Sequence, residues 1–239
     1  MERHPVILSI AGSDCSGGAG IQADIKTISA LGGYAASAIT AVTVQNTLGV
    51  RAVHAIPPEI VCGQIEAVME DLQPVAIKIG MVNDIQIVHV IADCIRKYSP
   101  EHIIYDPVMV STSGRRKLMT DEAIEEIKKK LLPLVTLVTP NIDEAKVLTG
   151  KSIQNTQDML EAAKQLSDSY QIHILIKGGH LEGDQMCDLL YSPDHTYYIY
   201  EEKKIESKNL HGTGCTLSSA IASYLAKGYS MKDSICHAK

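Results

Sequence analysis

The sequence predicts a three-layer α/β fold with a mostly parallel central sheet, helices on both faces and a β-hairpin at one edge. Three observations predict this fold. Short runs rich in Val, Ile and Leu alternate with helical patterns, these runs are nearly continuous in apolar residues, and residues 186–205 resemble two strands joined by a turn. Near-continuous apolar strands between helices are typical of a parallel sheet covered on both faces.

Hydrophobic periodicity and turn residues place each element. In chain order, we expect strand 6–10, helix 21–31, strand 34–44 with a loop at 45–49, helix 58–72, strand 76–79, helix 85–98, strand 103–105, helix 121–131, strand 134–138, helices 142–148 and 156–169, strand 172–176, hairpin strands 187–191 and 197–200, and helix 212–226.

Composition limits the function classes. The 239 residues show no linker, repeat or low-complexity segment, so a single domain spanning 1–239 is expected. The net charge of −6 lacks the excess of positive charge that is typical of nucleic-acid-binding proteins, so no nucleic-acid partner is expected. No apolar run reaches transmembrane length and the first ends at Gly12, so no membrane partner and a cytoplasmic location are expected. The six cysteines contain no C-x-x-C pair, which disfavours a zinc site and a disulfide framework.

The segment Gly212-Thr213-Gly214-Cys215 stands at the start of a small-residue helix. Glycines let backbone N–H groups turn inward, and a helix N-terminus adds a partial positive charge, so this segment predicts an anion hole. The same field is expected to lower the pKa of the Cys215 thiol. The alternative is a glycine-rich turn that only caps a core helix.

Polar residues follow three predicted strands. Asp106 follows one strand, Asn141 and Glu144 follow the next, and Lys177-Gly178 follows another. Each has an ordinary alternative: a turn aspartate, a helix capping box, and a loop lysine. Because the carboxyl ends of parallel strands share one edge, their convergence with the anion hole favours phosphoryl transfer. No G-x-x-x-x-G-K-[ST] motif exists, which excludes a P-loop mechanism.

A glycine-rich loop, residues 12–20, follows the first strand. Gly18-Ala19-Gly20-Ile21-Gln22-Ala23 fits the loose dinucleotide fingerprint G-x-G-x-x-G/A. The acidic ribose-binding residue is missing, because the second strand ends in Gln45-Asn46. A nicotinamide-dependent oxidoreductase is therefore disfavoured.

Seven blocks together carry a resemblance that spans essentially the whole chain in collinear order. They are Ala11-Gly12-Ser13-Asp14 with residues 16–24, Gln45-Asn46-Thr47, Lys78-Ile79-Gly80-Met81, Asp106-Pro107-Val108-Met109, Thr139-Pro140-Asn141, Lys177-Gly178-Gly179-His180, and His211-Gly212-Thr213-Gly214-Cys215. This set resembles the hydroxymethylpyrimidine/phosphomethylpyrimidine kinases of thiamine synthesis, in the ribokinase superfamily. The resemblance implies a ribokinase-like fold and an ATP- and Mg²⁺-dependent kinase. Its acceptors would be 4-amino-5-hydroxymethyl-2-methylpyrimidine and then the monophosphate of that alcohol.

The resemblance also implies roles for individual residues. Gln45 would bind the aminopyrimidine edge, since an amide offers a donor beside an acceptor. Substrate contacts are further implied for Gly12, Asp24, Met81 and Val108; phosphate contacts for Asn141, Lys177, Gly178 and Thr213; a catalytic anion hole for Gly212, Thr213, Gly214 and Cys215; and Mg²⁺ binding for Asp106 and Glu144. For Asp24 a structural role in the helix stays open. Cys215 is either a base or a donor through its backbone N–H.

Two departures from the family pattern bear on the nucleotide site. The lid-like loop at 111–116 contains Arg115 and Arg116, which either close over phosphates or lie in solvent. The chain stops at Lys239 within an expected helix, so the resemblance implies a C-terminus truncated on the adenine side. A pyridoxal kinase of the same branch and a non-catalytic pyrimidine- or nucleotide-binding regulator are the alternative functions. We expect a homo-oligomer, specifically a dimer, that can pair through the edge hairpin.

Overall fold

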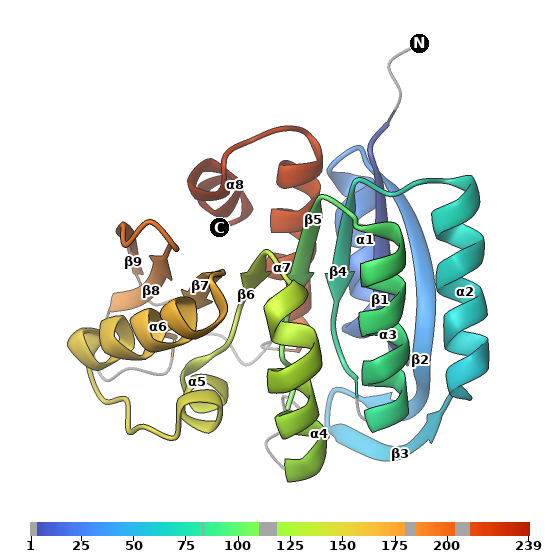
Figure 1. The fold of residues 1–239 in the computed structure, drawn as a ribbon, viewed down its shortest axis with the longest axis horizontal. Coiled ribbons are helices and arrows are strands. Elements are labelled where there is room, and N and C mark those ends of the chain that lie inside the picture. Colours follow the sequence, from blue (N-terminus) through green and yellow to red (C-terminus); the bar gives the residue numbers. More distant parts are fainter. Residues whose placement is uncertain (1–3, 83, 110–118, 180–184, 204–210) are drawn as a thin grey trace.

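One nine-stranded sheet runs through the part of the chain that the structure describes, which is residues 4–82, 84–109, 119–179, 185–203 and 211–239 of a computed structural model (Figure 1). The strand order is β3-β2-β1-β4-β5-β6-β7-β8-β9. The strands are β1 Val6–Asp14, β2 Tyr34–Asn46, β3 Gly49–Ala55, β4 Ala76–Ile79, β5 His102–Tyr105, β6 Leu137–Val138, β7 His173–Ile176, β8 Gln185–Tyr191 and β9 Tyr197–Lys203.

Strands β2, β1, β4, β5, β6 and β7 are parallel, and β3, β8 and β9 add antiparallel edges. In the central register, Ile7 of β1 lies opposite Ala35 of β2 and Ala76 of β4. The predicted mostly parallel sheet with an edge hairpin is therefore confirmed.

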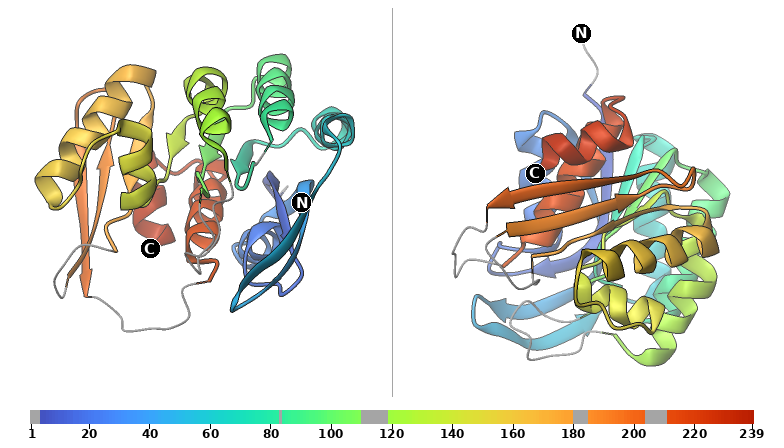
Figure 2. Two further views of the ribbon diagram at one scale, coloured as in Figure 1. Left: turned by 90° about the horizontal axis from the view of Figure 1, so that it is seen from below. Right: turned by 90° about the vertical axis from the view of Figure 1, so that its left-hand side faces the viewer.

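Helices cover both faces of the sheet, as the view from below shows (Figure 2, left). The helices α1, α7 and α8 pack on one face, and α2 to α6 pack on the other. Their bounds are α1 Gly20–Ala30, α2 Pro58–Asp71, α3 Ile85–Tyr98, α4 Asp121–Glu126, α5 Ile142–Thr149, α6 Thr156–Tyr170, α7 Thr213–Ala226 and α8 Met231–Ala238. After α4 the chain continues as a π-helical turn, Ile127–Leu131, and a 3₁₀ turn, Leu132–Leu134.

The structure differs from the expected elements at two strands. Strand β3 is absent from the sequence prediction, which has only a loop at 45–49. Most of its side chains are exposed and it pairs only with β2, so no apolar pattern marks it. Strand β6 is only Leu137–Val138, because Pro133 lies in a 3₁₀ turn where a longer strand 134–138 was expected.

A buried ion pair joins the sheet to the α1/α7 face. Asp24 of α1 and Lys78 of β4 are both fully buried, and Lys78 Nζ lies 2.9 Å from each Asp24 carboxylate oxygen. Ser9 of β1 donates to the same carboxylate at 2.6 Å, and Ser219 of α7 donates at 2.7 Å. Because buried charges are costly without full hydrogen bonding, this network fixes four elements relative to one another.

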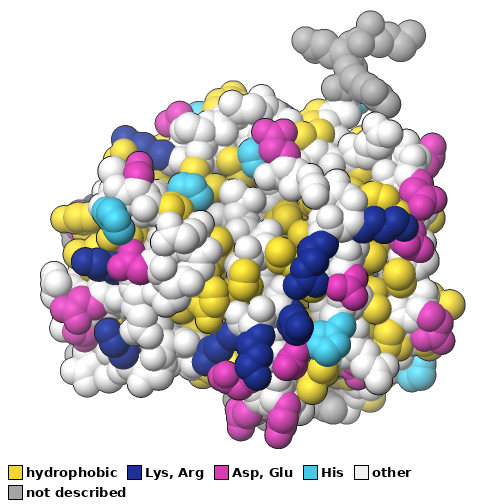
Figure 3. Space-filling model, viewed as in Figure 1, with side chains coloured by type: hydrophobic (Ala, Val, Ile, Leu, Met, Phe, Trp, Pro, Cys, Tyr) yellow, Lys and Arg dark blue, Asp and Glu magenta, His cyan; other side chains and the backbone are white. Residues whose placement is uncertain are grey.

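The surface carries charges of both signs. On the face shown in Figure 3, Lys and Arg side chains lie among Asp and Glu side chains. Elsewhere in the structure, and independently of that view, three ion pairs between residues three positions apart are Arg96–Asp93, Lys128–Glu125 and Lys146–Asp143 at 2.8–3.0 Å. Lys128 therefore belongs to a solvated helix face. None of the helices among the described residues combines the length and the apolar composition that a membrane span requires.

Removing one member of the buried pair should be strongly destabilising. We expect Asp24→Asn to lower the unfolding free energy by about 3–5 kcal/mol, because it leaves the Lys78 charge buried without a counter-charge. The double variant Asp24→Asn/Lys78→Met should cost less than the sum of the two single changes. Urea unfolding measures both. Asp93→Asn, which breaks the exposed pair with Arg96, is the control and should cost less than about 1 kcal/mol; additive single costs would show that the pair is not coupled.

Candidate active site

The residues predicted to carry chemistry lie at the carboxyl ends of the parallel strands. Asp106 follows β5, Asn141 follows β6 and Lys177 follows β7. Asn141 and Lys177 form an isolated parallel bridge, and the Lys177 N–H donates to the Pro140 carbonyl at 2.8 Å. The expected convergence of these motifs on one edge of the sheet is therefore present in the structure.

The first turn of α7 meets the glycine-rich loop at this edge. Gly212, the N-cap of α7, has a φ of +81°. A Cβ atom on Gly212 would lie 1.8 Å from the carbonyl oxygen of Gly18, which only glycine avoids. The first N–H groups of a helix have no acceptor inside it, so the turn that contains Gly214 and Cys215 offers donors for an anion.

An ion pair lies directly against that turn. Lys177 Nζ contacts Asp106 Oδ1 at 2.8 Å, and the Thr139 hydroxyl donates to the same oxygen at 3.1 Å. A Cβ atom on Gly214 would lie 3.2 Å from Lys177 Nζ and 3.3 Å from Asp106 Oδ2. Glycine at 214 thus allows a cation, a carboxylate and backbone donors to share one small region.

The charged side chains of this region shift one another's pKa values. Burial would raise the pKa of Asp106, but Lys177 and Lys78 outweigh it and hold that pKa below its ordinary value. Burial would lower the pKa of Lys177, but Asp106 and Glu144 raise it. Asp106 is therefore an anion and Lys177 a cation at neutral pH.

Asn141 and Glu144 form a capping box at the start of α5. The Glu144 carboxylate accepts from the Asn141 N–H at 2.8 Å, and the Asn141 side chain accepts from the Glu144 N–H at 2.9 Å. Burial raises the pKa of Glu144 to about 7, and Asp106 adds to this rise while Lys177 opposes it. Glu144 therefore caps helix α5, and its pKa depends on the charges of Asp106 and Lys177.

The expected lowering of the Cys215 pKa is wrong. Cys215 is buried, and desolvation raises the pKa of its thiol above the ordinary value although the charge of Lys78 opposes the shift. Sequence reasoning considered the helix terminus and left out the packing of α7 against the sheet, which removes water from the thiol. At neutral pH Cys215 is a thiol.

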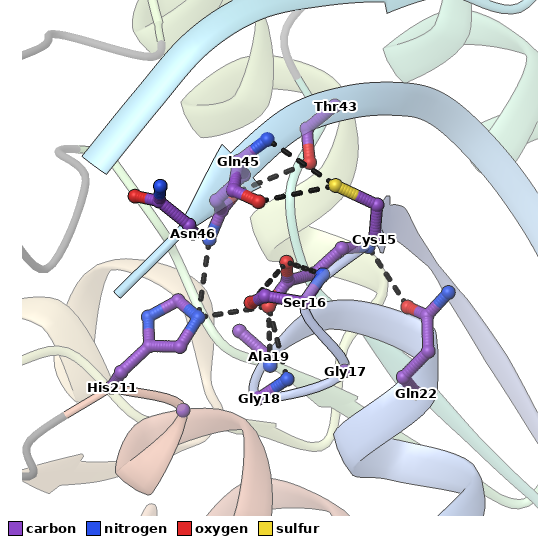
Figure 4. Close-up of polar contacts among 12 residues, drawn as sticks. Cys15, Ser16, Gly17, Gly18, Ala19, Gln22, Thr43, Gln45, Asn46 and His211 are labelled. Atoms are coloured by element: carbon purple, nitrogen blue, oxygen red, sulfur yellow. Dashed lines mark hydrogen bonds and ion pairs between the residues drawn. The ribbon is translucent and has the colours of Figure 1, made fainter. Parts of the chain in front are cut away.

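The residues expected around the substrate ring come from neighbouring segments. Met81 follows β4 and packs on Gly12 of β1, where a Cβ atom would lie 2.6 Å from Met81 Cε. Val108 is half-buried after Asp106. Gln45 lies at the end of β2, where its backbone contacts Cys15 and its side chain approaches His211 at 3.3 Å (Figure 4).

Two predicted contact residues have their polar atoms engaged inside the protein. Both carboxylate oxygens of Asp24 bind Lys78 and serine hydroxyls, so the geometry favours the structural role over contact with a ligand. The Gly178 N–H donates to Asp188 Oδ1 at 2.8 Å. A Cβ atom on Gly178 would lie 1.8 Å from the Cys187 carbonyl oxygen, so this glycine allows β8 to approach.

Among the residues of the recognised blocks that received no role from the sequence, Asp14, Lys78 and His211 make charged contacts in the structure. Asp14 accepts from His211 Nε2 at 2.8 Å, and Lys78 is the cation of the buried pair. A lysine within the apolar strand Ala76-Ile77-Lys78-Ile79 is a signal for a buried partner, but nothing local identifies Asp24. Arg115, Arg116 and the rest of the 111–116 loop, like His180, lie outside the described residues.

Comparison with known proteins defines the class. A pyridoxal kinase from Staphylococcus aureus in complex with AMP-PCP and pyridoxal superposes with a TM-score of 0.89 at 32% identity, covering 99% of this chain and 86% of that one. A phosphomethylpyrimidine kinase from Clostridium difficile 630 superposes with a TM-score of 0.87 at 45% identity, covering 98% and 96%. The fold is thus that of ribokinase-like small-molecule kinases.

The sequence defines the family more narrowly. Residues 14–239 match the family described as phosphomethylpyrimidine kinase. A hydroxymethylpyrimidine/phosphomethylpyrimidine kinase from Rhizobium meliloti is 47% identical over 235 residues, which are 98% of this chain and 87% of the relative. The chain belongs to the phosphomethylpyrimidine kinase family.

A methyl group at Gly212 should damage the anion hole. We expect Gly212→Ala to lower kcat/KM for phosphoryl transfer at least about tenfold, because its Cβ would displace Gly18 and tilt the first turn of α7. Gly228→Ala is the matched control, since Gly228 has a φ of +86° and no atom within 4 Å of the added carbon. It should cost about 1 kcal/mol of stability and leave kcat/KM within about twofold; an equal effect of both changes on kcat/KM would contradict the predicted geometry.

Glu144 should make stability fall as the pH rises from about 4.5 to about 7. Its pKa is raised in the folded protein, so the folded state binds the proton that the unfolded state has released in this window. The loss is on the order of 3 kcal/mol. Glu144→Gln, which keeps the capping box, should remove this slope in urea unfolding. Asp143→Asn is the exposed control on the same helix turn and should leave the slope unchanged; a slope that persists in Glu144→Gln would overturn the assignment.

Proposed function

We propose that this chain transfers the γ-phosphoryl group of ATP to the hydroxymethyl group of 4-amino-5-hydroxymethyl-2-methylpyrimidine. We also propose a second transfer, to the resulting monophosphate, which yields the diphosphate used in thiamine synthesis. The observation that carries the proposal is the position of the Asp106–Lys177 pair against Gly214, in a chain of the phosphomethylpyrimidine kinase family. The names of the relatives support both acceptors.

The site supplies positioning and charge, which are the main requirements of phosphoryl transfer. The first-turn amides of α7 would hold the transferring group, and Lys177 would offset its charge as the bond to the leaving oxygen lengthens. The acceptor hydroxyl oxygen forms a new P–O bond to the γ-phosphorus and releases its proton to water, while the bond between that phosphorus and the bridging oxygen breaks and ADP leaves with its electrons. Gln45, Met81 and Val108 would hold the ring, with Gly12 allowing close approach.

The carboxylates at the site fit a Mg²⁺ ion that is held mainly by phosphates and water. Among the described residues, no group of three His, Cys, Asp or Glu side chains forms a self-sufficient metal centre. Mg²⁺ needs only one or two carboxylates in such sites, and Asp106 and Glu144 are the available ones. Bound Mg²⁺ would neutralise charge on the phosphates, and it would favour the ionised form of Glu144.

An assay with three acceptors tests the proposal. The protein is incubated with Mg-ATP and each of hydroxymethylpyrimidine, its monophosphate and pyridoxal, and both ADP and phosphorylated products are measured. We expect turnover of the two pyrimidines. Turnover of pyridoxal alone would assign the chain to the pyridoxal kinase alternative, and binding without turnover of any acceptor would favour a non-catalytic regulator.

The Cys215 thiol should be dispensable as a base. Its raised pKa keeps it protonated at neutral pH, so we propose that Cys215 acts through its backbone N–H. Cys215→Ala should therefore keep kcat within about tenfold of the original, with the pH profile unshifted. A general base contributes about 10²–10⁴-fold, so a loss of that size that Cys215→Ser does not relieve would show an essential thiolate.

Three further expectations from the sequence remain predictions. These are the single domain, the dimer and the cytoplasmic location. Sedimentation of the purified chain would decide the dimer.

A further inference from the structure

The glycine-rich loop closes around the side chain of Asp14, the last residue of β1. Asp14 Oδ1 accepts from the Ser16 N–H at 2.9 Å and from the Ser16 hydroxyl at 2.8 Å. Asp14 Oδ2 accepts from the N–H groups of Gly18 and Ala19 at 3.1 and 2.9 Å. Burial would raise the pKa of Asp14, but hydrogen bonds from His211 and the loop hold that pKa below its ordinary value. These loop amides therefore bind a carboxylate of the protein itself.

His211 brings a further donor to the same carboxylate from a segment 197 positions away. Its Nε2 atom lies 2.8 Å from Asp14 Oδ2, and the two side chains are only 17% and 3% exposed. Because an ionised carboxylate can only accept, His211 Nε2 carries a hydrogen and donates it to Asp14. The ring also packs on the loop, since a Cβ atom on Gly18 would lie 2.5 Å from it (Figure 4). Hydrogen bonds to a charged group are strong, so this contact holds the two segments together.

This contact lies at the start of α7. His211 directly precedes Gly212, the N-cap of that helix. A Cβ atom on Gly212 would lie 1.8 Å from the Gly18 carbonyl oxygen, so the helix start packs on the same loop. The Thr216 N–H closes the first turn by donating to the Gly212 carbonyl at 2.9 Å. The turn whose amides are proposed to hold the transferring phosphoryl group therefore begins beside the residue that Asp14 binds.

We infer that Asp14 is a positioning residue for phosphoryl transfer, which acts through His211 to fix the first turn of α7 against the glycine-rich loop. The inference rests on the proposed function for the reaction that is measured. Amides that stabilise developing charge are effective only when they are fixed in advance, so a turn that frays should lower kcat. Ser219 ties the second turn of α7 to the buried carboxylate of Asp24. Asp14 provides the corresponding anchor before the first turn.

The first experiment measures kcat and KM for the hydroxymethyl alcohol with Mg-ATP. His211→Phe keeps a ring but loses the N–H donor. We expect kcat to fall about tenfold, the worth of one hydrogen bond to a charged group, while KM for the alcohol changes less than about threefold. His211→Gln keeps an N–H donor and should hold kcat within about threefold. Equal losses of kcat in the two variants, or a rise of KM with kcat unchanged, would overturn the inference.

Asp14→Asn tests the acceptor side of the contact. It places an NH₂ group against donors, so kcat should also fall at least about tenfold. Because both changes break one contact, the double variant Asp14→Asn/His211→Phe should lose less than the product of the two single losses. Losses that multiply would show that Asp14 does not act through His211.

Asp194→Asn is the matched control in a remote turn. Asp194 lies between β8 and β9, where it accepts from the Thr196 N–H at 3.0 Å and from the Thr196 hydroxyl at 2.7 Å, as Asp14 does from Ser16. The change should leave kcat within about twofold, since this turn does not contact α7. A loss equal to that of Asp14→Asn would assign the effect to general destabilisation and overturn the inference.

Hydrogen exchange follows the first turn of α7 without a substrate. In His211→Phe we expect the Thr216 amide to exchange about tenfold faster, while the Ala222 amide in the middle of α7 keeps its rate. Unchanged exchange at Thr216, or equal acceleration at both amides, would overturn the inference. If the original protein phosphorylates no acceptor, the proposed function fails, while exchange at Thr216 still decides whether His211 fixes the turn.

Discussion

The pairing of Asp24 with Lys78 is the constraint on which the arrangement of this site depends. Two charges without exposure to water are stable only when their hydrogen bonds are complete, and here Ser9 and Ser219 complete them. The four side chains come from β1, α1, β4 and α7. Because one of them lies in the second turn of α7, the network fixes the first turn of that helix relative to the edge of the sheet. The proposed anion hole is therefore positioned by a buried ion pair whose polar atoms are engaged within the protein.

A second layer of charges lies above this pair, closer to solvent. Lys78 acts electrostatically on Asp106 and Cys215, and Lys177 acts on Asp106 and Glu144. The result is an ionised aspartate, a neutral thiol and a glutamate that is poised near neutrality. The protonation state of Glu144 therefore depends on the charges that lie beside it. This property follows from burial and spacing together, since neither the carboxylates nor the lysines would behave so in water.

Much of the site was predictable because its residues occur in short local blocks. Asp106, Asn141 and Lys177 each follow a strand, and parallel strands bring their carboxyl ends together irrespective of helix length. Gly212 and Gly214 mark a tight turn before a helix, which local backbone chemistry explains. Asp24 shows the limit of such reasoning. Its place in a motif was compatible both with a substrate contact and with a structural role in the helix. Only its complete burial beside Lys78 distinguishes the two.

The sequence by itself determined the mostly parallel sheet, its edge hairpin, the strand-end position of the polar residues and the family. These properties depend on residue order and periodicity, which are local. The tertiary structure decided the ionisation of Cys215, the partner of Lys78 and the contact of His211 with Asp14 and Gln45. Each of these depends on atoms separated by 54 to 197 positions in the chain, or on water excluded by packing. Local sequence pattern can indicate that a buried polar group needs a partner, but it identifies neither the distant partner nor the water that packing excludes, so only the folded chain shows them.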